Sequence, residues 1–420
     1  MYLTQSNYIR HLSKTEYQIL RDLCVISNNL YNVALYNIRQ HYFQTHQFLT
    51  YESNYHECKS NDNYKLLQAG VAQQTLKVVD RSFKSFFNLI KKAKNNEYRF
   101  QDIRMPHYKK KGSMFPLVCS VNAISIKDGF FNLPLSHEFR KKHPDLGMIR
   151  IPFPDRIDAS AVKEIRILPV HNQFKIQYVY EASENDLQLD KNNVLAIDLG
   201  VDNLATCVNS CDGTSFILDG RYLKSVNYRY NKELARLRSI AMKQNMTVTN
   251  RISHITDRRN RRISDVMHKS ARYIINYCIS HDIGTIVIGY NKDIKRNVNM
   301  GSQNNQNFVQ IPTYQLRVLL MNLCERYGMQ CIETEESYTS KASFLDLDEL
   351  PVWNPEKPYH KPFSGKRVHR GLYVTGCNIM LNADVNGACN ILRKSKQNFD
   401  YEKLCKGLLT DPVRIRLLAD

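Results

Sequence analysis

The stretch NNVLAIDLGVDNLATCV, residues 192–208, places a carboxylate at the end of an apolar run. Residues 194–197 have the pattern of a buried strand, and Asp198 follows directly. An ionised carboxylate is costly to remove from water unless another group compensates its charge. Asp198 therefore indicates either a bound cation or an ordinary salt bridge or helix cap, and the stretch alone leaves these alternatives open.

Strands and helices alternate after this stretch. Three short strands, a helical stretch, a strand, a helix, a strand and a last helix follow one another, in the order of an RNase H-like α/β domain. The predicted segments are the strands 194–198, 204–210 and 215–220, a basic helical stretch over 221–272, the strand 285–290, the helix 312–327, the strand 329–336 and the helix 382–394.

The first half of the chain has two other patterns. Apolar residues recur at helical spacing over 16–40 and 70–92, with a polar connector between the two segments. From about 100 to 186 the spacing changes to period two with turn residues, which predicts antiparallel strands. The fold class is therefore α+β with several domains: a helical domain, a small β-barrel and the RNase H-like domain.

We predict the following domain limits. Residues 1–14 supply the first strands of the barrel, 15–100 the helical domain, 101–187 the rest of the barrel and 188–420 the RNase H-like domain.

The composition indicates a polyanionic partner. The 420 residues include 59 Lys and Arg against 40 Asp and Glu, a net charge of +19, and nucleic acid is the usual partner of such a chain. Residues 221–272 hold fourteen of these cations against three acids. No signal peptide or membrane-length apolar run is found, and none of the 11 cysteines forms a CxxC pair. We therefore expect a cytoplasmic protein with reduced cysteines, associated with the nucleoid through DNA and without a membrane partner.

A second acid occurs late in the chain. Asp384 lies in NADVNGACNI, residues 382–391, near the start of the last predicted helix. In an RNase H-like fold, acids on the central strand and on a late helix meet at one edge, where two Mg²⁺ ions can support phosphodiester hydrolysis. The alternative for Asp384 is an ordinary helix cap.

These motifs together resemble the RuvC-type nuclease domain of TnpB proteins, which are transposon-encoded, RNA-guided DNA nucleases. The resemblance is carried by VLAIDLGVDNLATC, GTIVIGYNKDIKRNVNMGSQNNQNFVQIP, ESYTSKASFLD and NADVNGACNIL, and it extends to CVISNNLYNVALYNIRQHYF and MPHYKKKG in the first half. It implies an Mg²⁺-dependent endodeoxyribonuclease, with Mn²⁺ as a substitute. The expected partners are a guide RNA from the transposon end and double-stranded DNA beside a short adjacent motif. A single chain is expected to suffice in this ribonucleoprotein.

The sequence departs from the family at the third acid. Most members end the strand that corresponds to TIVIGYN with a glutamate, and Gly289 stands there in this chain. The neighbouring strand ends in Glu335 and Glu336, which resembles the arrangement in a subset of the family. Strand alternation places only one of this pair toward the metals. We predict Asp198, Glu335 and Asp384 as the ligands, with Glu336 as the alternative to Glu335.

A second departure concerns zinc. The family commonly carries a four-cysteine zinc ribbon before the last aspartate, but the corresponding segment here contains Cys377, His360 and His369 only. We expect a lobe without structural zinc over residues 339–380, inserted in the nuclease domain for loading of the target strand. Its predicted stabilising residues are Phe344, Trp353, Tyr359 and Phe363.

Nucleic-acid contacts are predicted for the basic faces and for the YTSK segment after the glutamates, whose residues fit a hydrogen-bonded turn equally well. The predicted residues are Lys77, Arg81, Lys84, Lys109, Lys110, Lys111, Arg258, Arg259, Arg261, Arg262, Tyr338, Thr339, Ser340 and Lys341. Three other functions fit parts of the pattern: a nuclease-inactive RNA-guided DNA-binding repressor, a compact CRISPR effector, and a DDE transposase. The transposase lacks the barrel and the TnpB-like segments.

Overall fold

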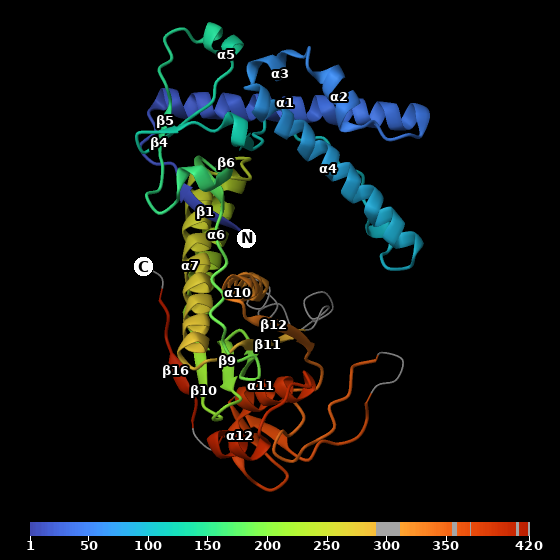
Figure 1. Ribbon diagram of the computed structural model, residues 1–420, viewed down its shortest axis with the longest axis vertical. Coiled ribbons are helices and arrows are strands. Elements are labelled where there is room, and N and C mark those ends of the chain that lie inside the picture. Colours follow the sequence, from blue (N-terminus) through green and yellow to red (C-terminus); the bar gives the residue numbers. More distant parts are fainter. Residues whose placement is uncertain (291–310, 355–358, 370, 409–410, 419–420) are drawn as a thin grey trace. The chain divides into compact units, whose positions relative to one another are not determined.

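The chain forms two compact units, residues Met1–Ser183 and Glu184–Asp420. The division falls four residues before the predicted boundary at 187/188. Both units contain helices and sheets, so the α+β class is confirmed. The computed structural model (Figure 1) describes the whole chain except residues 291–310, 355–358, 370, 409–410 and 419–420. Part of the motif GTIVIGYNKDIKRNVNMGSQNNQNFVQIP therefore lies outside the described residues.

Two long helices dominate the first unit. Helix α1 (Lys14–Thr45) begins at a capping box, in which the Ser13 side chain and Glu16 bond to each other's backbone N–H. Helix α4 (Ala69–Lys94) packs against α1 through a shared apolar core (Figure 1). Both helices contain the predicted ranges, because their apolar stripes are long and regular.

The prediction of a polar connector without secondary structure between these helices is wrong. The segment contains helices α2 (Tyr51–Cys58) and α3 (Asp62–Leu66), which are capped by Thr50 and Asn61. Only a few side chains of each helix are buried, so the apolar spacing that predicts a helix is nearly absent from the sequence.

The predicted barrel consists of two separate sheets. A four-stranded antiparallel sheet has the order β1-β7-β6-β2, and a smaller one has the order β3-β4-β5. The strands are β1 (Tyr2–Tyr8), β2 (Leu117–Ser120), β3 (Ile126–Lys127), β4 (Phe130–Asn132), β5 (Arg150–Pro152), β6 (Val162–Val170) and β7 (Gln173–Glu181), and helix α5 (His137–Lys142) lies between β4 and β5 in the chain.

A six-stranded sheet forms the centre of the second unit, in the order β12-β11-β8-β9-β10-β16. Strands β8, β9 and β10 form an antiparallel meander, and β11 and β12 extend it in parallel beyond β8. The strands are β8 (Val194–Leu199), β9 (Asn203–Asn209), β10 (Ser215–Asp219), β11 (Thr285–Tyr290), β12 (Gln330–Glu335) and β16 (Val413–Ile415). The predicted order of strands is confirmed, and β16 is an unpredicted addition.

Helices cover both faces of this sheet. Ile197 and Ile286 belong to the core shared with α7 and α10, whereas Val194 and Ala196 pack with α11 and α12 (Figure 1). The predicted basic helical stretch is two helices that lie side by side, α6 and α7. The helices are α6 (Arg221–Lys243), α7 (Asn250–Ser280), α10 (Thr313–Tyr327), α11 (Ala383–Lys394) and α12 (Tyr401–Leu408).

A small sheet precedes α11 in the chain. It contains β13 (Lys366–His369), β14 (Leu372–Val374) and β15 (Met380–Asn382). Among the described residues, no helix combines the length and the apolar character needed to cross a membrane.

Candidate functional site

Asp198 lies on the face of the central sheet that α11 covers. Strand alternation gives it the same side as Val194 and Ala196, which pack against that helix. Helix α11 approaches closely at Gly387, where an added Cβ would lie 2.8 Å from Asp198 Oδ2. The absence of a side chain at Gly387 therefore lets helix α11 pack directly against the Asp198 carboxylate.

Asp384 lies in the first turn of α11. The helix cap is Asn382, whose side chain accepts the backbone N–H groups of Asp384 and Val385, so the cap alternative for Asp384 is wrong. The Asp384 carboxylate instead accepts hydrogen bonds from Asn203 Nδ2 at 2.5 Å and Arg367 Nη2 at 3.1 Å. Nothing in the sequence pattern indicated either partner, because both lie far from Asp384 in the chain.

The two glutamates at the end of β12 have different surroundings. The Glu335 carboxylate pairs with Lys394 at the end of α11 and accepts the Ser337 backbone N–H at 2.6 Å. Glu336 Oε2 lies 3.0 Å from the position that a Cβ of Gly289 would take. Glu336 therefore lies beside Gly289 and interacts with Asp198, whereas Glu335 is bound by Lys394, and the ligand role of either glutamate stays a prediction.

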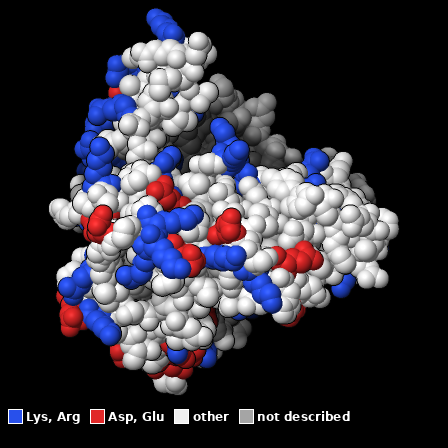
Figure 2. Space-filling model, turned by 90° about the horizontal axis from the view of Figure 1, so that it is seen from above, with Lys and Arg blue, Asp and Glu red and all other residues white. Residues whose placement is uncertain are grey.

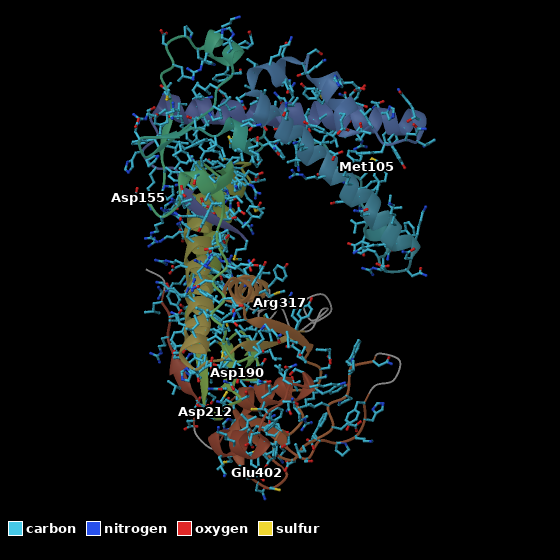
Figure 3. All side chains as sticks on the ribbon, viewed as in Figure 1. Met105, Asp155, Asp190, Asp212, Arg317 and Glu402 are labelled. Carbon is cyan, nitrogen blue, oxygen red and sulfur yellow. The ribbon has the colours of Figure 1, made fainter. Side chains whose placement is uncertain are left out.

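Alternation predicted Glu335 on one face of the sheet and Glu336 on the other, and β12 ends at Glu335. Ile332 packs with the core on the α11 face, so the same alternation gives Thr334 and Glu336 that face. The sequence did not show which face of β12 the helix α11 covers. Glu333, within the strand, points to the other helix layer and pairs at 2.8 Å with Arg317 of α10. Figure 3 labels Arg317.

Gly289 lies next to Glu336 on the α11 face of the sheet. It pairs in register with Thr334 of β12, and an added Cβ would also lie 2.5 Å from Ile391 Cδ1. The glycine thus leaves the space into which Glu336 reaches from the neighbouring strand.

We expect Gly289→Ala to lower the free energy of unfolding by about 1–3 kcal/mol, because the methyl group overpacks a buried site and displaces Glu336. Chemical denaturation measures this change. Gly147→Ala is the matched control, since a Cβ at Gly147 meets nothing within 4 Å. Equal stability of the two variants would contradict a tight fit at Gly289.

The electrostatics of the site reflect crowded negative charge. Burial, and then the carboxylates of Glu336 and Asp384, raise the pKa of Asp198 to about 8, against the influence of Arg367. Burial and the adjacent Glu335 raise the pKa of Glu336 to about 7. Burial also acts to raise the pKa of Glu335, but Lys394 and the Ser337 hydrogen bonds outweigh it and lower that pKa.

These residues fit a hard divalent cation by donor type and charge. Carboxylate oxygens are the ligands that Mg²⁺ prefers, and a cation would relieve the repulsion that raises the pKa of Asp198. Among the described residues, no group of three His, Cys, Asp or Glu side chains is placed to hold an ion as it stands. The Arg367 guanidinium bonds to Asp384 Oδ1, so cation binding at that oxygen requires at least a rotation of the Arg367 side chain.

Two family models and a curated relative match parts of this chain. Residues 177–295 match the model of the family described as a probable transposase, OrfB_IS605, and residues 314–391 match the Cas12f1-like TNB domain. A TnpB-like protein, ORF457 of Acidianus two-tailed virus, is 24% identical over 234 residues, which are 53% of this chain and 46% of the viral protein. The match thus spans less than half of that relative. Together these matches support a TnpB-family protein.

One solved structure supports the fold of this chain. The chain resembles the cryo-EM structure of a Cas12f1–sgRNA–target DNA complex with a TM-score of 0.57 and 16% identity, over 90% of this chain and 83% of that one. The mini-RNA-guided endonuclease CRISPR-Cas_phi3 is more distant, with a TM-score of 0.45, 10% identity, and coverage of 98% and 94%. Only the first carries weight here, and it concerns the fold.

Two asparagines fix the segment after the glutamates to α11. Asn390 Nδ2 donates to the carbonyls of Thr339 and Ala342 at 2.9 and 2.7 Å, and Asn386 bonds to Ala342 and Phe344. Both amides are fully buried. These bonds explain the two asparagines of the last motif, which hold residues 339–344 in place beside Glu336.

The aromatic residues predicted to stabilise the lobe over 339–380 divide into three groups. Tyr359 and Phe363 stack at 5.5 Å and contact Tyr338, as expected of a small aromatic cluster. Phe344 instead belongs to the core beneath the central sheet, and Trp353 is 59% exposed. The prediction is therefore wrong for Phe344 and Trp353.

The predicted nucleic-acid residues of the second unit differ in exposure. Arg258 and Arg261 are exposed on α7, whereas Arg259 bonds to Asn227 of α6 at 2.8 Å and Arg262 is half-buried. In the YTSK segment, Thr339 is buried and its hydroxyl donates to the Glu336 carbonyl, so Thr339 is part of the turn. Tyr338 is half-buried, and Ser340 and Lys341 are exposed.

In the first unit, Arg81 and Lys84 are exposed on α4, although Lys84 pairs with Asp80 at 2.8 Å, and Lys77 lies over the Tyr51 ring. The three lysines at 109–111 are exposed. On the face that Figure 2 shows, Lys and Arg side chains are more abundant than Asp and Glu side chains. These positions are accessible to a polyanion, and their nucleic-acid contacts stay predictions.

Proposed function

We propose that this protein is an RNA-guided endodeoxyribonuclease of a transposon, which cuts double-stranded DNA beside a transposon-adjacent motif. The matches to two family models and to a TnpB-like protein, and the resemblance to a Cas12f1 fold, support this class of activity. The observation that carries the proposal is the meeting of three carboxylates from distant segments, Asp198, Glu336 and Asp384, on the α11 face of the central sheet.

The proposed cofactor is Mg²⁺, as a pair of ions, with Mn²⁺ as a substitute. Asp198, Glu336 and Asp384 would hold the metal, which when bound supplies Lewis-acid stabilisation of the phosphodiester and an activated water. Glu335 is assigned a different role: Lys394 pairs with Glu335 and bonds to the Ser337 carbonyl, which fixes the end of β12 so that Glu336 faces Asp198.

Residues of this chain have definite tasks in the proposal. Lys394 forms an ion pair with Glu335. Among the described residues, Asp198 and Glu336 have no cationic side chain at a comparable distance, so their charge is available to a metal. Arg367, once it leaves Asp384, presents a guanidinium beside the site, which suits contact with a phosphate of the DNA strand. Arg258 and Arg261 would follow the nucleic-acid backbone.

The proposed activity is tested with the protein bound to RNA transcribed from its own element's end. A plasmid that carries the matching sequence beside a randomised adjacent motif is the substrate. We expect linear product with Mg²⁺, none with EDTA, and at least about a hundredfold less with Asp384→Asn, which removes a ligand charge but keeps the side chain's shape.

The opposite outcome has a defined meaning. Tight, guide-dependent binding of the plasmid without cleavage in Mg²⁺ or Mn²⁺ would contradict the nuclease and support the alternative of an RNA-guided DNA-binding repressor.

A compact CRISPR effector is a second candidate, favoured by the Cas12f1-like domain match over residues 314–391. It would use the same site chemistry. The DNA that flanks the gene discriminates between the two: a repeat array indicates the effector, and a transposon end that encodes a structured RNA indicates the transposon nuclease.

A further inference from the structure

The last described strand, β16, is an integral part of the central sheet. It pairs in parallel with β10, with Arg414 opposite Ile217. Beyond it, Leu417 packs against the core that contains α7, and Lys269 Nζ of α7 donates to the Leu418 carbonyl at 3.0 Å. The two family-model matches end at residues 295 and 391, so neither of them includes β16.

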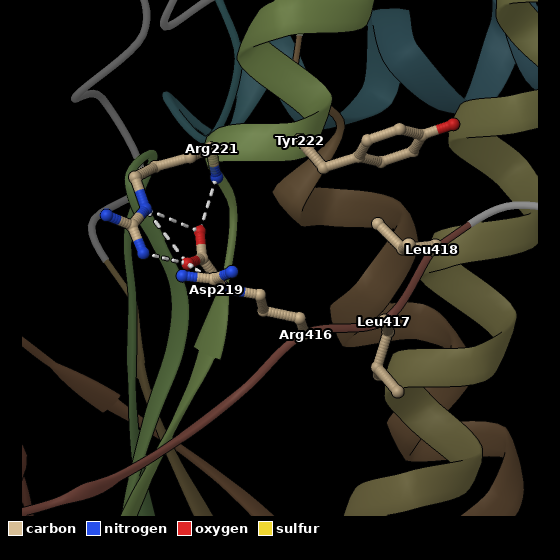
Figure 4. Close-up of a pocket in the computed structure, with 6 residues that line it drawn as sticks. All are labelled: Asp219, Arg221, Tyr222, Arg416, Leu417 and Leu418. Carbon is tan, nitrogen blue, oxygen red and sulfur yellow. Dashed lines mark hydrogen bonds and ion pairs between the residues drawn. The ribbon is translucent and has the colours of Figure 1, made fainter.

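Strand β16 brings arginines to a buried acid at the end of β10. Asp219 is 8% exposed, accepts hydrogen bonds from the Arg221 side chain and backbone, and has Arg414 and Arg416 at 3.6 and 3.9 Å. Figure 4 shows this acid with Arg221 and Arg416, in a pocket that Tyr222, Leu417 and Leu418 also line. Asp219 therefore helps to hold the guanidinium of Arg414 in place.

Arg414 has a second contact, which leads toward the candidate metal site. Its Nη1 donates to Asn203 Oδ1 at 2.8 Å, and Asn203 Nδ2 donates to Asp384 Oδ2 at 2.5 Å. Asn203 is the first residue of β9, and a Cβ added to Gly200 would lie 2.5 Å from the Asn203 carbonyl oxygen. The close turn between β8 and β9 thus fixes the backbone from which this amide extends.

The direction of these bonds follows from chemistry. A guanidinium can only donate and a carboxylate can only accept, whereas an amide does both at different atoms. With Arg414 bound to its oxygen, the Asn203 amide must turn its NH₂ group toward Asp384. Without Arg414, the amide can rotate by 180° and direct its oxygen at the carboxylate, which repels it.

We propose that Arg414 of β16 is a positioning residue of the nuclease centre, which acts through Asn203 to orient the Asp384 carboxylate. This inference rests on the proposed function, because it treats Asp384 as a metal ligand. Groups that hydrogen-bond to a ligating carboxylate typically change metal affinity by about 10–100-fold when they are removed. The effect of Arg414 is exerted one residue further away and is expected to be smaller.

The test is Mn²⁺ binding to the full chain, followed by electron paramagnetic resonance in the absence of nucleic acid. We expect Asn203→Leu to weaken binding about tenfold and Arg414→Met about threefold, with partial rescue in Arg414→Lys, which can still donate to the amide. The double variant should bind as Asn203→Leu does, because Arg414 acts through that amide. Arg416→Met is the matched control, since it removes an equal charge from the same segment and should bind as wild type.

Two results would overturn the inference: equal weakening by Arg414→Met and Arg416→Met, which indicates a general charge effect, or an additive effect in the double variant. Thermal unfolding of each variant verifies that the chain is folded. A wild-type chain that binds Mn²⁺ but never cuts guided DNA would contradict the proposed activity alone, and the comparison of variants would still decide the role of Arg414.

Discussion

Glu336→Gln is expected to lower guided DNA cleavage on the order of a thousandfold, whereas Glu335→Gln should stay within about tenfold of wild type. The Glu336 carboxylate lies over Gly289 and contributes to the raised pKa of Asp198. Glutamine keeps its shape but removes the charge that a cation requires. Lys394 already neutralises Glu335, so the Glu335→Gln substitution weakens the contact that holds the end of β12 and leaves the proposed metal ligands unchanged.

Single-turnover cleavage with excess protein–RNA complex measures both variants. Glu335→Gln leaves Lys394 partly buried without its carboxylate, at a cost of about 1–3 kcal/mol of stability, so the assay temperature must lie well below its unfolding midpoint. Lys394→Met is the companion control, expected to resemble Glu335→Gln. A reversed ranking, with Glu335→Gln inactive and Glu336→Gln active in folded protein, would return the ligand role to Glu335.

Long apolar patterns made much of the fold predictable. Strand β11 has the predicted bounds, β8 differs from its prediction by one residue at one end, and β12 differs by one residue at each end, because buried strands have continuous apolar runs. Alternation along β8 also correctly relates Asp198 to the face that carries Val194 and Ala196. Helices α2 and α3 were missed because their few buried side chains, such as Asn54 and Tyr64, leave no apolar stripe.

The site was predictable only as far as residue types on regular elements. Asp198 and Asp384 follow from a strand and a helix, but the choice between Glu335 and Glu336 depends on which face of β12 the helix α11 covers, and the sequence does not give this. Arg367, Lys394 and Asn203 meet the acids from distant segments. No local pattern marks such partners, since only the folded chain brings them together.

Asp198→Asn is expected to abolish cleavage and, without metal, to make the folded protein more stable. Burial and neighbouring carboxylates raise the pKa of Asp198 from 3.8 to about 8, so the folded state binds its proton more tightly than the unfolded state does. As the pH rises from about 4 to 8, the unfolded chain loses this proton first, and wild-type stability falls. Asparagine removes that loss.

We therefore expect Asp198→Asn to exceed wild type by about 1–3 kcal/mol at pH 8 and by less at pH 5.5, as measured by chemical denaturation in EDTA. Added Mg²⁺ should stabilise wild type and not the variant, because a ligand that binds only the folded state raises its stability. Asp202→Asn is the matched control: its carboxylate pairs with Lys224 at 2.5 Å, so neutralisation should bring no gain. If Asp198→Asn is less stable than wild type at pH 8 in EDTA, the acids do not repel one another, and the argument for a cation among them loses its physical basis.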